Sequence, residues 1–522
     1  MDRSLYLVNP RTPGPTYSGG EAYAFYGLPR ATLYAELALP TVAALVPPDF
    51  EVRLCDETCS SVDFDAPERF VGITGKVNQF SRAVELADAF RARGKIVLFG
   101  GSFASLSPAR VRPHCDILVR GELEVLADEL FADLRAGTWK AEYDGGRPEL
   151  GRTVVPRWDL YPNDRCAMGA VQTSRGCPFE CEFCDVIVYL GRKQRHKPVE
   201  AILAELDALY AHGYRRVFLS DDNLTVYRAR ARELLAALRD WNRAQVHGHV
   251  EFYTQCSVDL GRDPELVNLC AEAGLVHIFL GIETSNEASL REAKKRQNLV
   301  DQRQVVELLV QNGIAVESGG IVGFDHDGPE IFEQQLAFFQ TLPVPQITFG
   351  SLVAPEGTPL HARLAAAGRV IEGAGEAVAT PWNSNILPAS MSVEELERGV
   401  RWLANQLYSP RSFERRVLRF VELLGPRRDP RHLAGAVASE PRRTIDEHSL
   451  ELITRIPRLG ALEARMFANV TAAARRKPAA KSFVGSFLLF YMHVRSMYAQ
   501  AAIWDPTLHD ARGPSASASL ST

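Results

Sequence analysis

The segment TSRGCPFECEFC, residues 173–184, places three cysteines at spacings of four and three residues. It continues from the apolar run AVQTS, residues 170–174, which is typical of a buried strand. We therefore expect Cys177, Cys181 and Cys184 on a loop that leaves the end of a strand. Three thiolates this close together are soft metal ligands, and they suit either zinc or an iron–sulfur cluster.

The two kinds of metal site differ in the number of ligands that the protein must supply. A structural zinc site is usually closed by four protein ligands, and His196, shortly after Cys184, is the candidate for a fourth. In a four-iron cluster, three thiolates hold three irons and leave the fourth iron open to an exogenous ligand. Because the segment contains no fourth cysteine, we favour the open cluster and keep zinc as the alternative.

The composition describes a large globular protein. With 522 residues, the chain exceeds the size at which one hydrophobic core keeps growing, so we expect two or three folded units. It is 46% hydrophobic and 24% charged with a net charge of −5, and nothing in this balance indicates a nucleic-acid partner. The nine cysteines are an odd number scattered along the chain, so we expect no disulfide framework.

Neither a signal peptide nor a membrane span is expected. The N-terminal residues MDRSLYLVNP lack a basic region followed by a long apolar run, so we predict a cytoplasmic protein. The apolar stretch FVGSFLLFYM, residues 483–492, is shorter than the roughly 20 residues that cross a membrane. We predict that it lies in a buried helix.

Residues 1–145 alternate short apolar runs with helical patterns, which predicts a parallel, doubly wound, Rossmann-like sheet. The predicted strands are 5–8, 52–55, 70–74, 95–100 and 116–121, and the predicted helices are 81–94 and 121–137. In such sheets a ligand binds beyond the carboxyl ends of the strands. The residues expected there are Thr74, Gly75, Gly100, Gly101, Ser102 and Glu122.

Three further segments follow this unit. Residues 146–167 are rich in Gly, Pro and charge and predict a linker. Residues 168–388 contain six strand–helix units, with strands at 170–174, 216–221, 250–257, 277–283, 316–324 and 346–354, which predicts a partial TIM-like (β/α)6 barrel. Residues 389–505 predict a helical domain, with a helix start at Ser392 and Glu395, and residues 506–522 predict a disordered tail.

GCPFECEFC carries the CxxxCxxC pattern, with aromatic Phe183 before the last cysteine, and in this feature the chain resembles the radical S-adenosylmethionine (SAM) superfamily. The resemblance implies that Cys177, Cys181 and Cys184 bind a 4Fe-4S cluster whose open iron is chelated by SAM. Reduction of SAM then generates, in the usual case, a 5′-deoxyadenosyl radical. It also implies an electron donor such as flavodoxin or ferredoxin, and a small-molecule substrate.

Three later motifs occur in the order that this family implies. SDDNLT, residues 220–225, resembles the site for the SAM amino group and nominates Asp221, Asp222 and Asn223; a plain strand-end turn with a helix cap is the alternative. GIETSNE, residues 281–287, nominates Glu283 for the ribose. GGIVGF, residues 319–324, nominates Gly320 and Gly323 beside the adenine.

The first 145 residues resemble the B12-binding-type domain of the cobalamin-associated radical SAM subgroup, and the later segments resemble the subgroup that contains the hopanoid C-2 methylase. This resemblance implies a possible cobalamin site at Thr74, Gly100, Gly101, Ser102 and Glu122. The chain departs from the histidine-ligated cobalamin proteins because no DxHxxG motif precedes residue 160. Cobalamin binding is therefore an expectation that the sequence leaves open.

The leading hypothesis is an enzyme that methylates an unactivated carbon of a small or lipid-like molecule with cobalamin. The first alternative omits cobalamin and transfers the 3-amino-3-carboxypropyl group of SAM, or abstracts hydrogen. The second alternative is a non-catalytic iron–sulfur protein.

Three further segments carry weaker expectations. The segment AKKRQN, residues 293–298, is expected to contact SAM, with an exposed helical end as an equal alternative. The basic segment YLGRKQRHK, residues 189–197, is expected to be a solvated loop, with binding of an anionic group as the alternative. Strand alternation places Tyr253 and Gln255 on one face, where they can line a substrate space, and Cys256 on the other.

Overall fold

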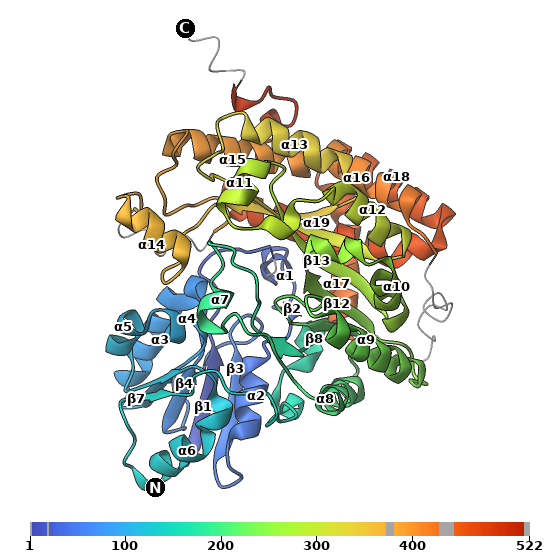
Figure 1. Cartoon of the computed structure of the whole chain (residues 1–522). Coiled ribbons are helices and arrows are strands. Elements are labelled where there is room, and N and C mark those ends of the chain that lie inside the picture. The colour runs from blue at the N-terminus through green and yellow to red at the C-terminus, as the bar shows by residue number, and fades with distance from the viewer. Residues whose placement is uncertain (1–2, 18–19, 372–379, 427–442, 516–522) are drawn as a thin grey trace.

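The computed structural model describes residues 3–17, 20–371, 380–426 and 443–515. It consists of two parallel sheets and a helical layer, and the segments run in that order along the colour scale of Figure 1. The blue N-terminal unit lies at the lower left, and the orange and red C-terminal helices lie at the top.

The N-terminal sheet is parallel and doubly wound, as predicted. Its strand order is β3-β1-β4-β5-β6-β7. The strands are β1 (Ser4–Asn9), β3 (Glu51–Asp56), β4 (Phe70–Ile73), β5 (Ile96–Phe99), β6 (Ile117–Arg120) and β7 (Glu142–Asp144). The main helices are α2 (Ala38–Leu45), α3 (Phe80–Arg91), α4 (Ser102–Leu106) and α6 (Ala127–Ala136). The order reverses at β1, so a crevice opens beyond the carboxyl ends of β1 and β4.

The second sheet has seven parallel strands that curl into a half-barrel, in the order β15-β14-β13-β12-β11-β8-β2. Its strands are β2 (Thr32–Tyr34), β8 (Cys166–Val171), β11 (Arg216–Leu219), β12 (Glu251–Cys256), β13 (Leu275–Glu283), β14 (Ala315–Val322) and β15 (Gln346–Ser351). The outer helices are α8 (Val199–Ala211), α9 (Arg228–Arg243), α10 (Pro264–Ala273), α12 (Gln302–Gln311) and α13 (Ile331–Thr341). All six predicted strands exist in the predicted order.

The seventh strand comes from the N-terminal part of the chain. β2 pairs with β8, so residues within the range 1–145 complete the second sheet instead of the first. Three residues are too few to show a strand period in sequence. The segment before β8 is also packed rather than a free linker, because Trp158 and Tyr161 are buried and Tyr161 donates a 2.5 Å hydrogen bond to Asp56 on β3.

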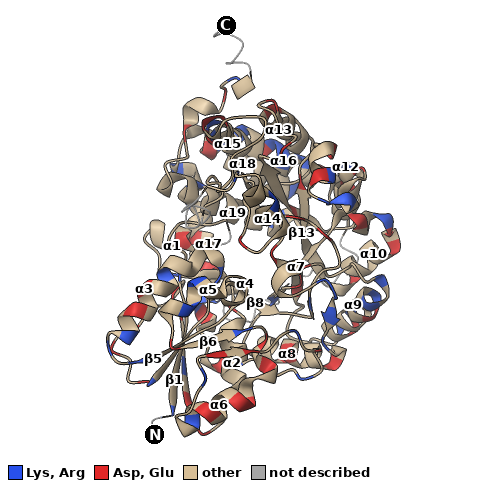
Figure 2. Cartoon of the chain, turned by 60° about the vertical axis from the view of Figure 1, so that its left-hand side comes forward, with Lys and Arg blue, Asp and Glu red and all other residues tan. Residues whose placement is uncertain are grey.

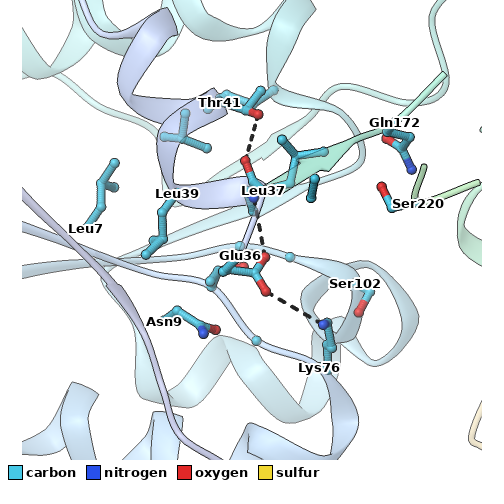
Figure 3. A pocket seen from close by; sticks show the side chains of 18 of the residues that line it. Leu7, Asn9, Glu36, Leu37, Leu39, Thr41, Lys76, Ser102, Gln172 and Ser220 are labelled. Atoms are coloured by element: carbon cyan, nitrogen blue, oxygen red, sulfur yellow. Dashed lines mark hydrogen bonds and ion pairs between the residues drawn. The ribbon is translucent and has the colours of Figure 1, made fainter. Parts of the chain in front are cut away.

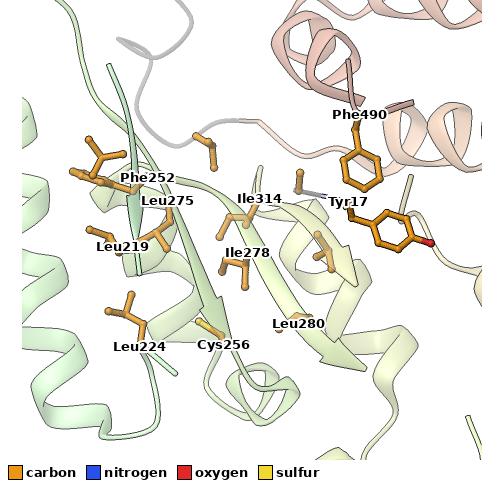
Figure 4. Packing of buried hydrophobic residues seen from close by; sticks show 14 of the residues in the cluster. Tyr17, Leu219, Leu224, Phe252, Cys256, Leu275, Ile278, Leu280, Ile314 and Phe490 are labelled. Atoms are coloured by element: carbon orange, nitrogen blue, oxygen red, sulfur yellow. The ribbon is translucent and has the colours of Figure 1, made fainter. Parts of the chain in front are cut away.

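The two faces of the half-barrel differ as strand alternation requires. On the outer face, Phe252, Cys256, Ile278 and Leu280 are buried against the helices (Figure 4). On the inner face of β12, Tyr253 and Gln255 retain partial exposure. The structure therefore places Tyr253 and Gln255 opposite Cys256, as predicted.

Helices close the open side of the half-barrel. They are α15 (Val393–Tyr408), α16 (Pro410–Leu423), α17 (Thr444–Thr454), α18 (Ala461–Arg476) and α19 (Lys481–Gln500). The predicted capping box at the start of α15 is present, because Ser392 and Glu395 exchange hydrogen bonds. Tyr17 fills the seam between β15 and α19: its hydroxyl is 3.0 Å from the Phe349 carbonyl and 2.9 Å from the Tyr498 hydroxyl.

The apolar stretch at 483–492 lies inside α19 and is largely buried, as predicted. None of the helices in the described part of the chain is both long enough and apolar enough to cross a bilayer. Acidic and basic residues are interspersed along the outer helices (Figure 2).

The predicted tail differs from expectation over its first half. Residues 506–508 form a 3-10 turn, and the carbonyls of Leu508 and Ala511 accept hydrogen bonds from Gln406 and Trp402 on α15. This segment stays ordered because it supplies partners to side chains that would otherwise be buried without one. Residues 516–522 lie outside the described ranges.

Candidate active site

The three cysteines lie on the loop that leaves β8, and a small hairpin closes this loop. β9 (Ser174–Arg175) pairs antiparallel with β10 (Arg195–His196), and the Cys177 amide donates to the Gly191 carbonyl at 3.2 Å. Gly176 has φ +95°, and a Cβ there would lie 2.7 Å from the Lys193 carbonyl oxygen. Only glycine fits this turn, which leads the chain directly into Cys177.

The thiols are free and partly buried. Burial raises the pKa of Cys177 to about 11 and that of Cys184 to about 12, so the thiols must lose protons when they bind a metal. Lys295 is buried beside them, and its charge favours the thiolate form of Cys177 and Cys184. The Gln297 side-chain amide lies 3.5 Å from the Cys181 sulfur.

The zinc alternative gains no support. His196, the candidate fourth zinc ligand, packs its ring edge-on against Tyr227, with 5.8 Å between centroids. The fit to a cluster therefore depends on the loop itself, which carries three thiols and no fourth protein ligand.

Asp221 and Asp222 follow β11 and have different surroundings. Asp221 is fully buried and accepts hydrogen bonds from the hydroxyls of Thr173, at 2.9 Å, and Ser174, at 2.6 Å. It therefore anchors the start of the cysteine loop. Asp222 accepts from the Gly176 amide at 3.1 Å and remains partly exposed to the cavity described below.

Both carboxyl groups titrate higher than usual because they are buried. Burial raises the pKa of Asp221 to about 6 and that of Asp222 to about 7. Asn223 is buried in the wall: its amide donates to Ser257 at 2.9 Å and its backbone carbonyl accepts from Gln194. Of the three nominated residues, Asp222 is the one that faces open space.

Glu283 ends β13 in an unusual backbone conformation. Its φ of +65° lies in the left-handed region, which is rare for a residue other than glycine and marks a site held in place by its surroundings. The carboxylate forms a buried ion pair with Lys295. A Cβ on Gly281 would lie 2.5 Å from one Glu283 oxygen, and one on Gly319 would lie 3.2 Å from the other.

The glycines of β14 point to opposite sides. Gly319 faces Glu283, whereas a Cβ on Gly320 would lie 3.1 Å from the ring of Phe339, on an outer helix. Gly323 has φ +104° and donates its amide to Asp327. The structure thus places Gly319 on the inner face, while the nominated Gly320 packs outward, because adjacent strand residues face opposite ways.

Phe183 packs against Phe324, with 6.3 Å between ring centroids, and the Lys295 ammonium lies 5.6 Å from its ring centroid. The aromatic residue of the cysteine pattern therefore connects the loop to Lys295 and to the end of β14.

A cavity of about 800 Å³ lies between the two sheets. Its lining includes Thr74, Gly100, Gly101, Ser102 and Glu122 at the carboxyl edge of the N-terminal sheet. From the half-barrel side, its lining includes Tyr34, Gln172, Phe218, Ser220, Asp222 and Gln255. Figure 3 shows Ser102 from the N-terminal unit below Ser220 and Gln172 from the half-barrel, and the ion pair between two further lining residues, Glu36 and Lys76. The cavity therefore connects all the positions nominated for cobalamin with Asp222.

Glu122 connects the two sheets as well as lining the cavity. Its carboxylate forms ion pairs with Arg175, at 2.6 Å, and Arg195, at 2.6 Å, both from the cysteine-loop hairpin. Arg175 also pairs with Glu124 at 2.6 Å. Glu122 therefore forms ion pairs with the half-barrel in addition to lining the cavity. The sequence predicted only a ligand-binding position for this residue.

The basic segment at 189–197 is only partly solvated. Arg192 and Lys193 are exposed, whereas Arg195 and Lys197 are buried, the latter paired with Glu205 at 2.6 Å. The expectation of a solvated loop is wrong for these two residues, because each has a carboxylate partner in the interior.

Comparisons with known proteins agree with this architecture. A model of the radical SAM superfamily matches residues 171–339, and a model described as a domain of unknown function, DUF4070, matches residues 358–503. An uncharacterized methyltransferase, sll1242, of a Synechocystis strain is 32% identical over 432 residues, which cover 81% of this chain and 79% of that protein. Hopanoid C-2 methylase of Rhodopseudomonas palustris is 30% identical over 342 residues, just under two thirds (64%) of each chain.

Two solved structures share the fold. OxsB, a cobalamin-dependent SAM radical enzyme with aqua-cobalamin and SAM bound, aligns with a TM-score of 0.60 and 13% identity over 96% of this chain and 80% of that one. The methyltransferase TsrM from Kitasatospora setae, with tryptophan substrate and a SAM analog bound, aligns with a TM-score of 0.55 and 18% identity over 70% of this chain and 76% of that one. At these identities the likeness concerns the fold alone.

A parallel half-barrel with a three-cysteine loop after its first long strand, preceded by a Rossmann-like sheet, defines the class of this protein. The chain belongs to the radical SAM superfamily and is a radical SAM enzyme, which implies a 4Fe-4S cluster and SAM. Several of its relatives are named as methyltransferases.

Sequence analysis did not nominate two residues that shape the site, Arg175 and Gly319. Lys295 falls in the segment 293–298, where an exposed helical end was one expectation; the structure instead buries Lys295 against Glu283. Arg175 stands inside the cysteine segment, which was the one local hint for it. The partners of these residues come from distant strands, and no local pattern predicts such a pairing.

Proposed function

We propose that this enzyme is a cobalamin-dependent methyltransferase that methylates an unactivated carbon of a small or lipid-like molecule. The observation that carries the proposal is the cavity of about 800 Å³, because one continuous space touches the carboxyl edge of the N-terminal sheet and Asp222 beside the cysteine loop. A ligand of the first sheet would therefore lie directly over the opening of the half-barrel.

The cavity suits a large, flat cofactor. Gly101 has φ +93°, and a Cβ there would lie 2.8 Å from the backbone of Gly75, so the two strand-end loops pack with backbone against backbone. This close packing leaves a broad edge formed by Thr74, Gly100, Gly101 and Ser102, which would hold cobalamin. No histidine lines the cavity in the described part of the chain, so the fit is to cobalamin without a histidine ligand from this protein.

The half-barrel supplies the groups suited to SAM. Asp222 presents a carboxylate to the cavity next to the loop, which suits the SAM ammonium group. Glu283 would accept from the ribose hydroxyls, with Lys295 fixing its orientation and Gly319 leaving room on the inner face.

Bound at the sheet edge, methylcobalamin would supply a methyl group to a substrate carbon held in the half-barrel. Two relatives of at least 30% identity, one of them hopanoid C-2 methylase, are named for methyl transfer, which supports this use of SAM.

The test is to identify what the anaerobically reconstituted full chain makes from SAM, with and without cobalamin, by mass spectrometry. Formation of 5′-deoxyadenosine together with cobalamin-dependent S-adenosylhomocysteine is expected. Methylthioadenosine formed without cobalamin would instead indicate aminocarboxypropyl transfer. Cys177→Ala should lose the cluster and all products, whereas Cys115→Ala, a buried cysteine of the N-terminal unit, should keep both.

A further inference from the structure

The inner face of the half-barrel, below the cavity, combines aromatic rings with a few polar groups. Strand register puts Tyr253 beside His277, and Glu317 between Phe279 and Gln346, all on this face. The rings of Tyr253 and His277 lie 5.2 Å apart, and those of Tyr34 and Phe218 lie 5.1 Å apart. Tyr34 and Phe218 also line the cavity, so the cavity reaches the inner face of the half-barrel at these two rings.

Three polar groups on this face lack partners in the described ranges. His277 and Gln346 are each about 5% exposed, and neither the Nε2 of His277 nor the Oε1 of Gln346 has a hydrogen-bond partner. Among the same residues, the Glu317 carboxylate makes no hydrogen bond or ion pair, although its side chain is partly accessible. Buried polar atoms are seldom left unpaired in proteins, so these groups are available to pair with a polar ligand.

The surroundings of Glu317 are not cationic. Burial raises its pKa to about 7, and burial lowers the pKa of His277 to about 4, so this imidazole is neutral at physiological pH. Tyr34, from β2, and Tyr408, from α15, are close enough for the charge of Glu317 to contribute to their raised pKa values. The buried guanidinium of Arg416 lies beyond Tyr408 and donates to the Val344 carbonyl at 2.9 Å.

Glu317 lies deeper in the half-barrel than the residues proposed to hold SAM. Gly319, two residues further along β14, faces Glu283, the residue proposed for the ribose. Two strand residues span about 7 Å, so Glu317 lies roughly that far deeper in the half-barrel. A molecule that enters from the cavity and packs on Tyr34 and Phe218 would bring one end to Glu317.

We infer that the half-barrel binds a largely apolar ring compound with a protonated amine, which pairs with Glu317 while Tyr34, Phe218 and Tyr253 pack around the rings. This inference rests on the proposed function, because it names the substrate class of the same site. A pure hydrocarbon would leave these three polar groups unpaired, and an anion would be repelled by the carboxylate. A ligand that offers only a neutral hydrogen-bond donor would leave the charge of Glu317 uncompensated.

The experiment compares a cationic probe with its neutral analogue. Tryptamine and tryptophol share the indole ring and differ in the amine and the hydroxyl. Their affinities for the reconstituted full chain with SAM are measured by titration calorimetry at pH 8. We expect tryptamine to bind about tenfold tighter, in line with one charge-assisted pair, and Glu317→Gln to remove this preference. The matched control, Glu200→Gln on the exposed side of α8, should keep it.

Equal binding of the two probes, absence of tryptamine binding, or a preference that survives in Glu317→Gln would overturn the inference. Release of 5′-deoxyadenosine and cobalamin-dependent release of S-adenosylhomocysteine from SAM are measured in the same preparations. If both releases persist while the probe preference is absent, only the substrate class is wrong. If either release is absent, the proposed function fails.

Discussion

Arg175 joins the cysteine loop to the N-terminal sheet through Glu122, whose carboxylate it meets at 2.6 Å. Arg175 stands two residues before Cys177, and Glu122 stands just beyond β6 at the cavity. Both side chains are buried or nearly so. The position of the metal loop relative to the cavity is therefore fixed by a buried ion pair, which is costly to break on one side only.

Replacing Arg175 should loosen this connection. Arg175→Met leaves Glu124 without its cation and Glu122 with only Arg195, so the free energy of unfolding should fall by about 3 kcal/mol. Urea denaturation measures the change. Arg157→Met, which removes an exposed pair with Asp159, should cost less than about 1 kcal/mol. Equal losses in the two variants would contradict a special role for Arg175.

Substitutions of Asp221 and of Asp222 should have different effects on the enzyme. Asp221→Asn weakens the hydrogen bonds through which Asp221 holds Thr173 and Ser174 at the start of the cysteine loop. The iron content after reconstitution should therefore fall. Asp222→Asn should keep the iron and lower the affinity for SAM about tenfold, because one charged partner is lost. Iron and sulfide analysis and equilibrium SAM binding check both outcomes. If both variants lose iron and SAM affinity to the same extent, Asp221 and Asp222 do not have separate roles.

The stability of the protein should depend on Glu317 in a pH-dependent way. The pKa of Glu317 is raised from 4.5 to about 7, so its contribution to stability is complete below pH 4.5 and is lost as pH rises through 7. Glu317→Gln should therefore be more stable than the parent by roughly 3 kcal/mol at pH 8, and by less than about 1 kcal/mol at pH 5. His277 titrates in both proteins, so its effect cancels. Urea midpoints of the variant and the parent are measured at both pH values. If the difference in stability between the two proteins is the same at pH 5 and pH 8, Glu317 does not titrate as an unpaired buried carboxyl group.

The two neighbouring glycines of β14 offer a matched pair. Gly319→Ala places a methyl group 3.2 Å from Glu283 and should lower SAM affinity about tenfold by disturbing the pair with Lys295. Gly320→Ala presses on Phe339 and should cost about 1–3 kcal/mol of stability while SAM affinity stays the same. SAM titration and urea denaturation of both variants test the assignment; the reverse pattern would mean that Gly320 faces the ligand.

Local patterns were sufficient for most of the fold. The runs predicted as strands at 5–8 and 95–100 are short, apolar and bounded by turn residues, and each corresponds to a strand of the first sheet, β1 and β5. The start of α15 followed from Ser392 and Glu395, because a capping box depends on residues three apart. β2 was missed because three residues carry no period, and its partner β8 lies more than 130 residues away.

The sequence by itself determined the class of chemistry, because three cysteines at spacings of four and three define a metal loop wherever the strand before them lies. It also determined the order of the strand-end motifs. Only the tertiary structure decided which residues meet: Asp221 inside the wall and Asp222 at the cavity, Gly319 inward and Gly320 outward, Arg175 against Glu122. The reason is physical, because burial and pairing depend on which side chains from distant strands come within a few ångströms of one another, and no local pattern contains that information.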